Sequence, residues 1–203
     1  MDQPRIRVAI AQMHPIAGAI RRNVDTMLEQ IERARGADAE LVVFPELITS
    51  GYILGDRWEH DAFIREIADV DEEIRHASSG LIVVWGSVKA DWNKIGEDGR
   101  VRKYNAARIA QNGAWVSNGL LDGWMPKTNL PKYRIFDDGR HFYAGDKLAA
   151  EYGCEPIQFL QAFRVTIRGH VLKLALAICE DLWEDEYRAK ISRIYAGKRA
   201  DLL

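Results

Sequence analysis

The stretch Val171-Leu-Lys-Leu-Ala-Leu-Ala-Ile-Cys179-Glu-Asp-Leu-Trp-Glu-Asp185 joins a short apolar run to a cysteine, and acidic residues follow the cysteine at once. The apolar run predicts a buried strand. Such a strand would deliver Cys179 to its carboxyl end, which is the edge where ligands bind in open α/β sheets. A thiol at that edge can act as a nucleophile, although most strand cysteines are inert buried thiols. The role of Cys179 therefore depends on what the remaining chain places beside it.

The N-terminal part of the chain has the pattern of a strand–helix–strand unit. Residues 6–12 predict a first strand, and the apolar run at 41–44 predicts a second, buried one. Between them, the apolar residues of 20–34 fall on one face of a helix. This order predicts two parallel strands joined by a crossover helix, and it makes the chain an α/β protein.

Glu46 directly follows the second predicted strand, so it too is expected at a carboxyl end. An isolated glutamate in such a place is most often a solvated loop residue. Residues 49–52 then predict a loop, 61–74 a second helix and 81–88 a third strand, while the polar residues 91–100 predict another loop. The pair Asn112-Gly113 predicts a hairpin between strands at 104–110 and 115–116.

The segment 121–152 has no regular apolar period and is rich in glycine, proline and aromatic residues. Irregular segments of this length in a compact domain are often functional. A second hairpin is predicted between strands at 162–167 and 171–179, and a helix at 185–196. Residues 197–203 read as the start of a further strand, which predicts that the sequence is a truncated part of a larger domain.

Composition and charge exclude several classes of protein. A chain of 203 residues with 47% hydrophobic and 29% charged residues is typical of one globular domain. The net charge of −2 gives no strong attraction to nucleic acid or to an anionic membrane, and no apolar run is long enough for a membrane helix. Two cysteines and five histidines without ligand spacing argue against a disulfide framework and against a metal site. A cytoplasmic protein is the simplest interpretation.

Glu46, Lys127 and Cys179 are the candidates for chemistry, because they are predicted at strand ends or in the irregular segment. A thiol-dependent amide or nitrile hydrolase needs these three side-chain types. The thiol attacks the carbonyl carbon, and a base takes its proton and later returns one to the leaving ammonia. A cation, helped by a backbone N–H, stabilises the tetrahedral oxyanion. The residue types alone are weak support, since most enzymes contain all three.

The local motifs around these residues are more specific. Val-Phe-Pro-Glu46-Leu, then Lys127-Thr-Asn-Leu-Pro-Lys-Tyr133-Arg-Ile-Phe-Asp-Asp138-Gly-Arg-His-Phe142, then Ala-Ile-Cys179-Glu-Asp-Leu-Trp183 stand in that order. Together they resemble the nitrilase (carbon–nitrogen hydrolase) superfamily. Within it, the middle motif and Ile-Cys-Glu-Asp-Leu-Trp resemble the glutaminase domain of glutamine-dependent NAD synthetases. The resemblance extends from Ile6 to Leu203 and implies an αββα sandwich with two central mixed sheets, here truncated at the C-terminus.

The resemblance implies a role for each motif residue. Glu46 would be the general base, Lys127 the oxyanion-stabilising cation and Cys179 the nucleophile. The amide N–H of Glu180 would be the second oxyanion donor. Tyr52, Tyr133 and Asp138 align with positions that line the glutamine pocket of the synthetase subfamily, so we expect them, with Glu180, to bind the substrate.

Some residues depart from the family pattern or allow a simpler reading. Asp138 stands where the family usually has a glutamate, which is one methylene longer, and it could instead cap a helix or pair with Arg140. Tyr52 and Tyr133 could be packing aromatics. Lys132 and Arg134 replace asparagine and glycine and add charge near the pocket.

The function that this resemblance implies is hydrolysis of the side-chain amide of glutamine through a thioester on Cys179, with release of ammonia to a synthetase module. Residues 1–203 would form the glutaminase domain, incomplete and without that module, because the Ser-Gly-Gly loop for ATP pyrophosphate is absent. The amidase reaction needs no cofactor, and ATP would act only in the synthetase. Homo-oligomers are expected, with 185–196 as the contact surface. The alternatives are a free-standing amidase for another small amide and a catalytically silent interaction domain.

Overall fold

The structure is a computed structural model that describes residues 5–96, 98–183, 187 and 189–203. Its strands are β1 Val8–Ile10, β2 Leu41–Val43, β3 Ile82–Ile95, β4 Val101–Gln111, β5 Ala114–Trp115, β6 Trp124–Pro126, β7 Phe163–Ile167 and β8 His170–Leu174. Its α-helices are α1 Ile20–Gly36, α2 Asp61–Ala77, α3 Asp138–His141, α4 Gly145–Glu151, α5 Pro156–Phe159 and α6 Ile191–Gly197, and its 3₁₀-helices are η1 Gly55–Glu59 and η2 Cys179–Leu182.

The N-terminal strand–helix–strand unit is confirmed. β1 and β2 are parallel neighbours in one sheet, and α1 connects them. The buried side of α1 carries the apolar residues of the predicted stripe, among them Val24, Met27 and Ile31, each at 0% exposure. Burying such a side chain contributes about 1.5–3 kcal/mol. The apolar period of the sequence therefore sets both the helix and the face that it turns to the sheet.

β3 and β4 extend this sheet and form its longest hairpin. β3 is parallel to β2, and β4 is antiparallel to β3. The predicted loop at 91–100 is partly wrong, because β3 continues through Asp91 to Ile95 and pairs there with the start of β4 after a register shift. The side chains of this extension are mostly exposed or half-buried, so polar residues are tolerated in a strand that the apolar pattern does not reveal. The Asn112-Gly113 hairpin to β5 is confirmed.

The segment that the sequence leaves irregular contains short elements. β6 pairs with β4 in the six-stranded sheet, and α3 and α4 follow it. These elements have three, four and seven residues, so each is too short to produce a recognisable period. The segment nevertheless folds back on the sheet, because Lys127 N–H donates to the carbonyl of Asn105 at 2.8 Å.

The second hairpin, β7–β8, is confirmed, but its second strand is shorter than predicted. β8 ends at Leu174, five residues before Cys179, because its partner β7 begins at Phe163, opposite Leu174. Beyond this point Ala175 N–H donates to the carbonyl of Leu202 at 2.8 Å, and Leu174 and Leu202 form a parallel bridge. Cys179 is thus delivered by an extended segment rather than by a paired strand.

The predicted helix at 185–196 begins at Ile191 among the described residues and ends at Gly197. The part of this prediction at 184–186 and 188 lies outside the described residues. Between Gly197 and the last residue, only Leu202 forms a strand-like bridge. None of the helices in the described part of the chain is long and apolar enough to span a membrane.

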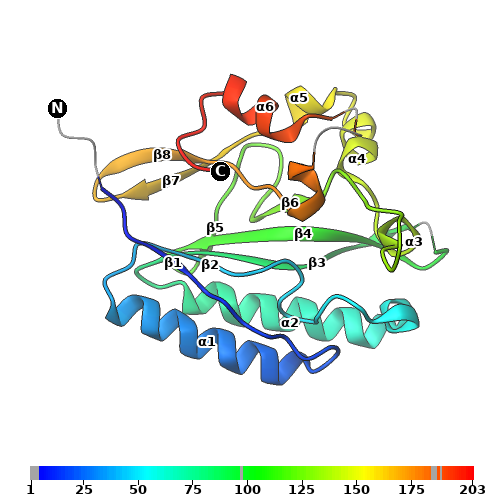
Figure 1. Ribbon diagram of the computed structural model, residues 1–203, viewed down its shortest axis with the longest axis horizontal. Helices are drawn as coiled ribbons and strands as arrows, with labels where there is room; N and C mark the ends of the chain where they lie inside the picture. Colours follow the sequence, from blue (N-terminus) through cyan, green and yellow to red (C-terminus); the bar gives the residue numbers. More distant parts are fainter. Residues whose placement is uncertain (1–4, 97, 184–186, 188) are drawn as a thin grey trace.

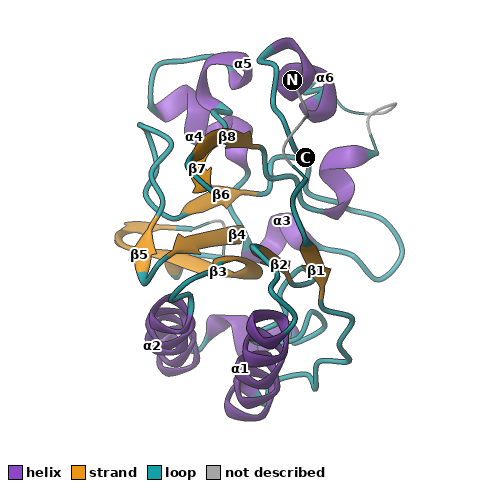
Figure 2. Ribbon diagram, turned by 90° about the vertical axis from the view of Figure 1, so that its left-hand side faces the viewer, coloured by secondary structure: helices purple, strands orange, loops and turns teal. Residues whose placement is uncertain are grey.

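The elements form four layers, and the expected α/β class with two stacked sheets is confirmed. α1 and α2 cover one face of the six-stranded mixed sheet, while the β7–β8 hairpin and α4–α6 lie on its other side (Figures 1 and 2). One apolar core lies between α1, α2 and the sheet, and the other lies between the sheet, the hairpin and α6. The segments that carry Glu46, Lys127 and Cys179 lie where the six-stranded sheet meets the part of the chain that follows it, from Lys127 onward.

Candidate active site

Glu46 lies in a turn that is held tightly against β3. Gly86 N–H donates to the carbonyl of Pro45 at 3.1 Å, and Ile48 N–H donates to the carbonyl of Gly86 at 3.0 Å. A Cβ atom on Gly86 would lie 2.3 Å from the backbone nitrogen of Leu47 and 2.5 Å from the Cα of Glu46. Only glycine allows this approach, so the end of β2 and the middle of β3 fix the backbone of Glu46 together.

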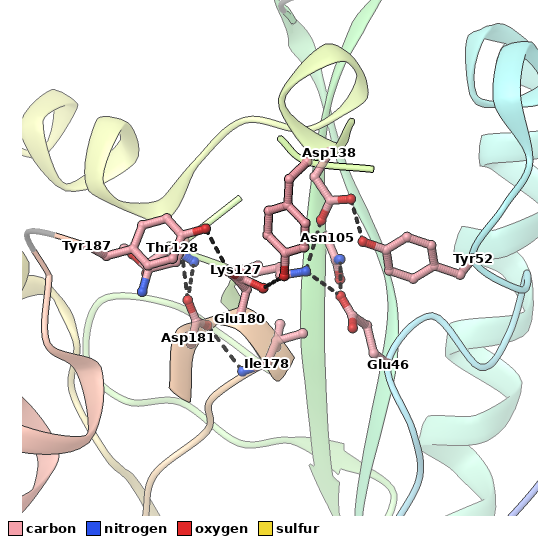
Figure 3. A network of polar contacts seen from close by, with 12 residues as sticks. Glu46, Tyr52, Asn105, Lys127, Thr128, Asp138, Ile178, Glu180, Asp181 and Tyr187 are labelled. Carbon is pink, nitrogen blue, oxygen red and sulfur yellow. Dashed lines mark hydrogen bonds and ion pairs between the residues drawn. The ribbon is translucent and has the colours of Figure 1, made fainter. Parts of the chain in front are cut away.

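Lys127 places its ammonium group between two carboxylates. Its Nζ lies 2.7 Å from Oε1 of Glu46 and 2.9 Å from Oδ2 of Asp138, and the residue is 1% exposed (Figure 3). Burial acts to lower the pKa of Lys127, but the two carboxylates outweigh burial and raise it. Lys127 is therefore a buried cation at neutral pH.

Asp138 is fully engaged by its neighbours. Its second oxygen accepts a hydrogen bond from the Tyr52 hydroxyl at 2.5 Å, and burial followed by this bond raises the pKa of Tyr52. Arg140 instead pairs with Asp56 and with a neighbouring glutamate, so the alternative in which Asp138 pairs with Arg140 is wrong. The Asp138 side chain also caps no helix. Its carboxylate therefore helps Glu46 to orient the Lys127 ammonium.

Asn105 is a neighbour of Glu46 to which the sequence reasoning gives no role. From β4 it donates Nδ2–H to Oε1 of Glu46 at 2.6 Å, and it is 1% exposed. A carboxylate only accepts hydrogen bonds, so the amide nitrogen must face Glu46 and the amide oxygen must face away. That oxygen is buried and has no partner among the described residues. An asparagine within a predicted strand, at 104–110, is the signal that could have marked this residue.

Cys179 opens the η2 turn in a left-handed backbone conformation, with φ at 42°. Such a φ is uncommon for a residue with a side chain, and outliers of this kind gather at functional sites. Cys179 is exposed, and together with Glu46 it lines a mainly apolar cavity of about 480 Å³. Partial burial of the sulfur by its surroundings, followed by the charge of Glu46, raises the pKa of Cys179, while Lys127 opposes the rise. The raised pKa favours the neutral thiol over the thiolate.

Glu180 and Tyr133 form a second polar group beside the turn. The Tyr133 hydroxyl donates to Oε2 of Glu180 at 2.9 Å, and the Tyr187 hydroxyl donates to Oε1 at 2.8 Å (Figure 3). Glu180 is 5% exposed, whereas Tyr133 is 46% exposed, so the tyrosine forms the solvent-exposed part of this group. The sequence reasoning missed Tyr187, which stands alone in the chain without a recognisable motif.

The predicted site residues therefore fall into two hydrogen-bonded groups, with Cys179 sharing a cavity with one of them. Glu46, Tyr52, Lys127 and Asp138 form one group, and Tyr133 and Glu180 form the other. Asp181, which the sequence reasoning also missed, lies buried in the same turn as Cys179. The described residues contain no cluster of His, Cys, Asp and Glu suited to a metal ion.

A buried lysine between two carboxylates, near a thiol on a tight turn of a layered α/β fold, defines the class of carbon–nitrogen hydrolases that use a cysteine. The comparison with family models gives the same class. Residues 7–203 match the model described as Carbon-nitrogen hydrolase, and the chain belongs to that family.

Relatives of known type agree with this assignment. The chain is 29% identical over 189 residues to a glutamine-dependent NAD(+) synthetase from Xanthomonas campestris, an alignment that covers 91% of this chain and 29% of the relative. The structure of a glutamine-dependent NAD+ synthetase from Acinetobacter baumannii matches with a TM-score of 0.69 and 26% identity, covering 95% of this chain and 30% of that one.

A nitrilase-superfamily amidase from Nesterenkonia AN1 has the same fold. It matches with a TM-score of 0.69 and 19% identity over 97% of this chain and 64% of its own. The chain thus spans less than a third of the synthetases described above and about two thirds of this amidase.

Proposed function

We propose that the protein hydrolyses the side-chain amide of glutamine to glutamate and ammonia through a thioester on Cys179. The observation that carries the proposal is the Lys127 ammonium held 2.7 Å from Glu46, with Glu46 and Cys179 facing one cavity. Base, cation and thiol are the three groups that amide hydrolysis by a cysteine requires. The relatives that are glutamine-dependent NAD(+) synthetases support glutamine as the amide.

In the proposed reaction, Glu46 takes the proton of the Cys179 thiol as the sulfur attacks the amide carbon. The Lys127 ammonium and the backbone N–H of Glu180 stabilise the oxyanion. Glu46 then gives the proton to the leaving nitrogen, and ammonia departs as the thioester forms. A water molecule, deprotonated by Glu46, attacks the thioester, and the sulfur regains a proton when glutamate leaves. The steps use only side chains, backbone and water, so they require no cofactor.

Tyr52, Tyr133, Asp138 and Glu180 are the proposed substrate-binding residues, and their contacts suggest different parts. Both oxygens of Asp138 are occupied by Lys127 and Tyr52, so Asp138 serves the substrate through the lysine. Glu180 is bonded to tyrosine hydroxyls and lies next to the partly exposed Tyr133. Both oxygens of Glu180 are also occupied, but by neutral hydroxyls, whereas Asp138 already faces the Lys127 ammonium. The charge of Glu180 is therefore the better match for the amino group of glutamine.

The wider setting follows from the same relatives. We propose that residues 1–203 form a glutaminase domain, or part of one, whose ammonia is used by a synthetase module that binds ATP. The relatives are about three times as long as this chain, which leaves room for such a module in them. A homo-oligomer is proposed as well, with the surface around α6 as the contact.

Ammonia release from glutamine by the purified protein tests the proposal directly. We expect hydrolysis of glutamine to exceed that of acetamide or propionamide, and a glutamine-like diazoketone to label Cys179 with one equivalent. Efficient cleavage of the short amides without cleavage of glutamine would instead identify a free-standing amidase. A Cys179 that resists labelling, with no hydrolysis of any amide, would identify a catalytically silent domain.

A further inference from the structure

Asp181 joins the two loops that carry Lys127 and Cys179. Its Oδ1 accepts hydrogen bonds from the backbone N–H groups of Thr128 at 3.0 Å and Asn129 at 2.8 Å. Its Oδ2 accepts the backbone N–H of Ile178 at 3.1 Å. Thr128 and Asn129 directly follow the lysine, and Ile178 directly precedes the cysteine. One side chain therefore fixes the backbone on both sides of the proposed reaction centre (Figure 3).

The carboxylate of Asp181 is buried, and in the described part of the chain its hydrogen bonds all go to these backbone N–H groups. It is 2% exposed, and among the described residues it forms no ion pair. Burial raises the pKa of Asp181 to about 6, and the backbone N–H bonds and Lys127 limit the rise, so the group is still ionised at neutral pH. Burying an unpaired charge is costly unless hydrogen bonds to the charged form compensate. Packing alone does not require a charged side chain at this position. Bridging two loops requires one hydrogen-bond acceptor for each loop, and the two oxygens of Asp181 supply them.

We propose that Asp181 is a positioning residue that sets the distance between the Lys127 ammonium and the Cys179 sulfur for the hydrolysis proposed above. Lys127 is fixed from the other side by Glu46 and Asp138. Among the residues that the structure describes, no hydrogen bond joins the cysteine turn, Cys179–Leu182, to the six-stranded sheet. Without the hydrogen bonds of Asp181, the cysteine turn and the lysine loop, residues 127–129, can move relative to each other. Displacements of about 1 Å at a reaction centre cost on the order of 100-fold in rate.

Asp181→Asn tests this proposal because it keeps the size of the side chain. Its single amide oxygen can serve the N–H groups of the lysine loop or that of Ile178, and its NH₂ group then faces a donor on the other side. Asp71→Asn is the matched control. Asp71 is also 2% exposed, and it accepts the Trp85 indole N–H at 2.7 Å and pairs with Arg108 on the α2 side of the sheet.

The variants are made in a Cys154→Ser background, so that alkylation by iodoacetamide reports on Cys179 alone. Thermal unfolding, kcat and KM for glutamine, and the alkylation rate are measured for each. We expect Asp181→Asn to lower kcat about tenfold or more with KM within about twofold, and to slow alkylation, because Lys127 favours the thiolate less when it is displaced. Asp71→Asn should lower the unfolding temperature while leaving kcat and the alkylation rate within about twofold.

The proposal is overturned when Asp181→Asn behaves like Asp71→Asn, losing stability but keeping both kcat and the alkylation rate. This outcome can be told apart from failure of the proposed function. If the parent protein releases no ammonia from glutamine, the glutaminase proposal fails, whereas the alkylation rates of the two variants still decide whether Asp181 positions Cys179.

Discussion

Two parts of the molecule hold their functional side chains in different ways. The sheet half runs up to Pro126 and contains the six-stranded sheet with α1 and α2, and the loop half runs from Lys127 onward. In the sheet half, Glu46 follows β2, and ladder-like hydrogen bonds to Gly86 of β3 fix its backbone. In the loop half, Cys179 follows a segment whose strand pairing ends at Ala175, has a left-handed φ, and depends on the neighbouring Asp181 for its placement. The proposed base thus stands on regular structure, and the proposed nucleophile stands on a turn that side chains support.

This difference separates two requirements of the chemistry. The base must meet the lysine and the substrate at fixed distances, and a rigid sheet provides this. The nucleophile must be accessible and must change its bonding partner during the reaction, and an exposed turn provides that. Substitutions in the two halves should therefore differ in how strongly they affect rate and stability.

The largest effect is expected at Cys179, in the loop half. Cys179→Ala removes the nucleophile and should lower glutamine hydrolysis by a factor of about 10⁴ or more, because no other group can form the thioester. The unfolding temperature should change little, since the cysteine is exposed. Cys154→Ser is the matched control, because a serine hydroxyl can still donate to the carbonyl of Ala149, which the Cys154 thiol contacts at 3.4 Å. Retention of hydrolysis in the alanine variant would contradict the account.

In the sheet half, Glu46→Gln keeps the shape of the side chain but removes the base. General-base catalysis contributes a factor of about 10²–10⁴, so kcat should fall by roughly that amount. The amide can still accept from Asn105, so the fold should persist. Glu73→Gln, which alters a surface ion pair with Arg21, is the control and should leave kcat unchanged. Equal rates for both variants would show that the sheet half does not supply the base.

A third substitution moves the base without changing it. Gly86→Ala forces the Glu46 turn away from β3, because the new Cβ would lie within 2.5 Å of its backbone. We expect kcat to fall on the order of 100-fold and the unfolding temperature to drop. Gly36→Ala, at the end of α1, has nothing within 4 Å of its added Cβ and should be neutral or slightly stabilising. Kinetics and thermal unfolding of the pair decide whether the rigidity of the sheet half matters for rate.

The sequence predicts the sheet half better than the loop half, and the reason is physical. Apolar periods reveal α1, α2 and the buried strands, whereas the polar extension of β3 up to Ile95 has no such period. Glu46, Lys127 and Cys179 are recognisable because each stands in a motif. The roles of Asn105 and Asp181 depend on which distant backbone or side-chain groups they meet, so only the folded chain reveals them.

The sequence also does not reveal where β8 ends. The run from Ala175 to Ile178 is apolar and buried in part, as a strand would be. Among the described residues, however, only Ala175 forms a backbone–backbone hydrogen bond from this run to a neighbouring segment. Burial and strand pairing produce the same apolar pattern, and pairing depends on where the partner strand begins. The position of Cys179 on a turn therefore could not be predicted.

The smallest effect is expected at Glu151, which links the two halves of the molecule by ion pairs. Glu151 of α4 binds Lys94 and Arg102 of the β3–β4 hairpin and the Tyr143 hydroxyl. Hydrogen bonds from Lys94 and Tyr143, the largest causes, lower the pKa of Glu151 to about 2. The folded-state pKa lies below the unfolded value, so this stabilisation is present above about pH 4.5 and is lost as the pH falls toward 2.

Glu151→Gln should therefore lower the unfolding temperature at pH 7 by about 2–4 °C, the effect of roughly 1 kcal/mol for a partly exposed network. The difference from the parent should shrink as the pH falls below about 4.5, and kcat should be unchanged. Unfolding temperatures measured across this pH range test the clamp. A difference that does not depend on pH would show that the carboxylate charge is not what joins the two halves.

The central claim is that the base of the sheet half activates the thiol of the loop half to form a thioester with glutamine. Rapid mixing of the Glu46→Gln variant with glutamine, acid quenching and mass spectrometry of the protein test it most directly. We predict an adduct with the mass of glutamine less ammonia on the peptide that contains Cys179, because acylation is slow and hydrolysis is slower still without the base. An adduct at another residue, or glutamate formed by the parent protein with no adduct in either protein, would contradict the account.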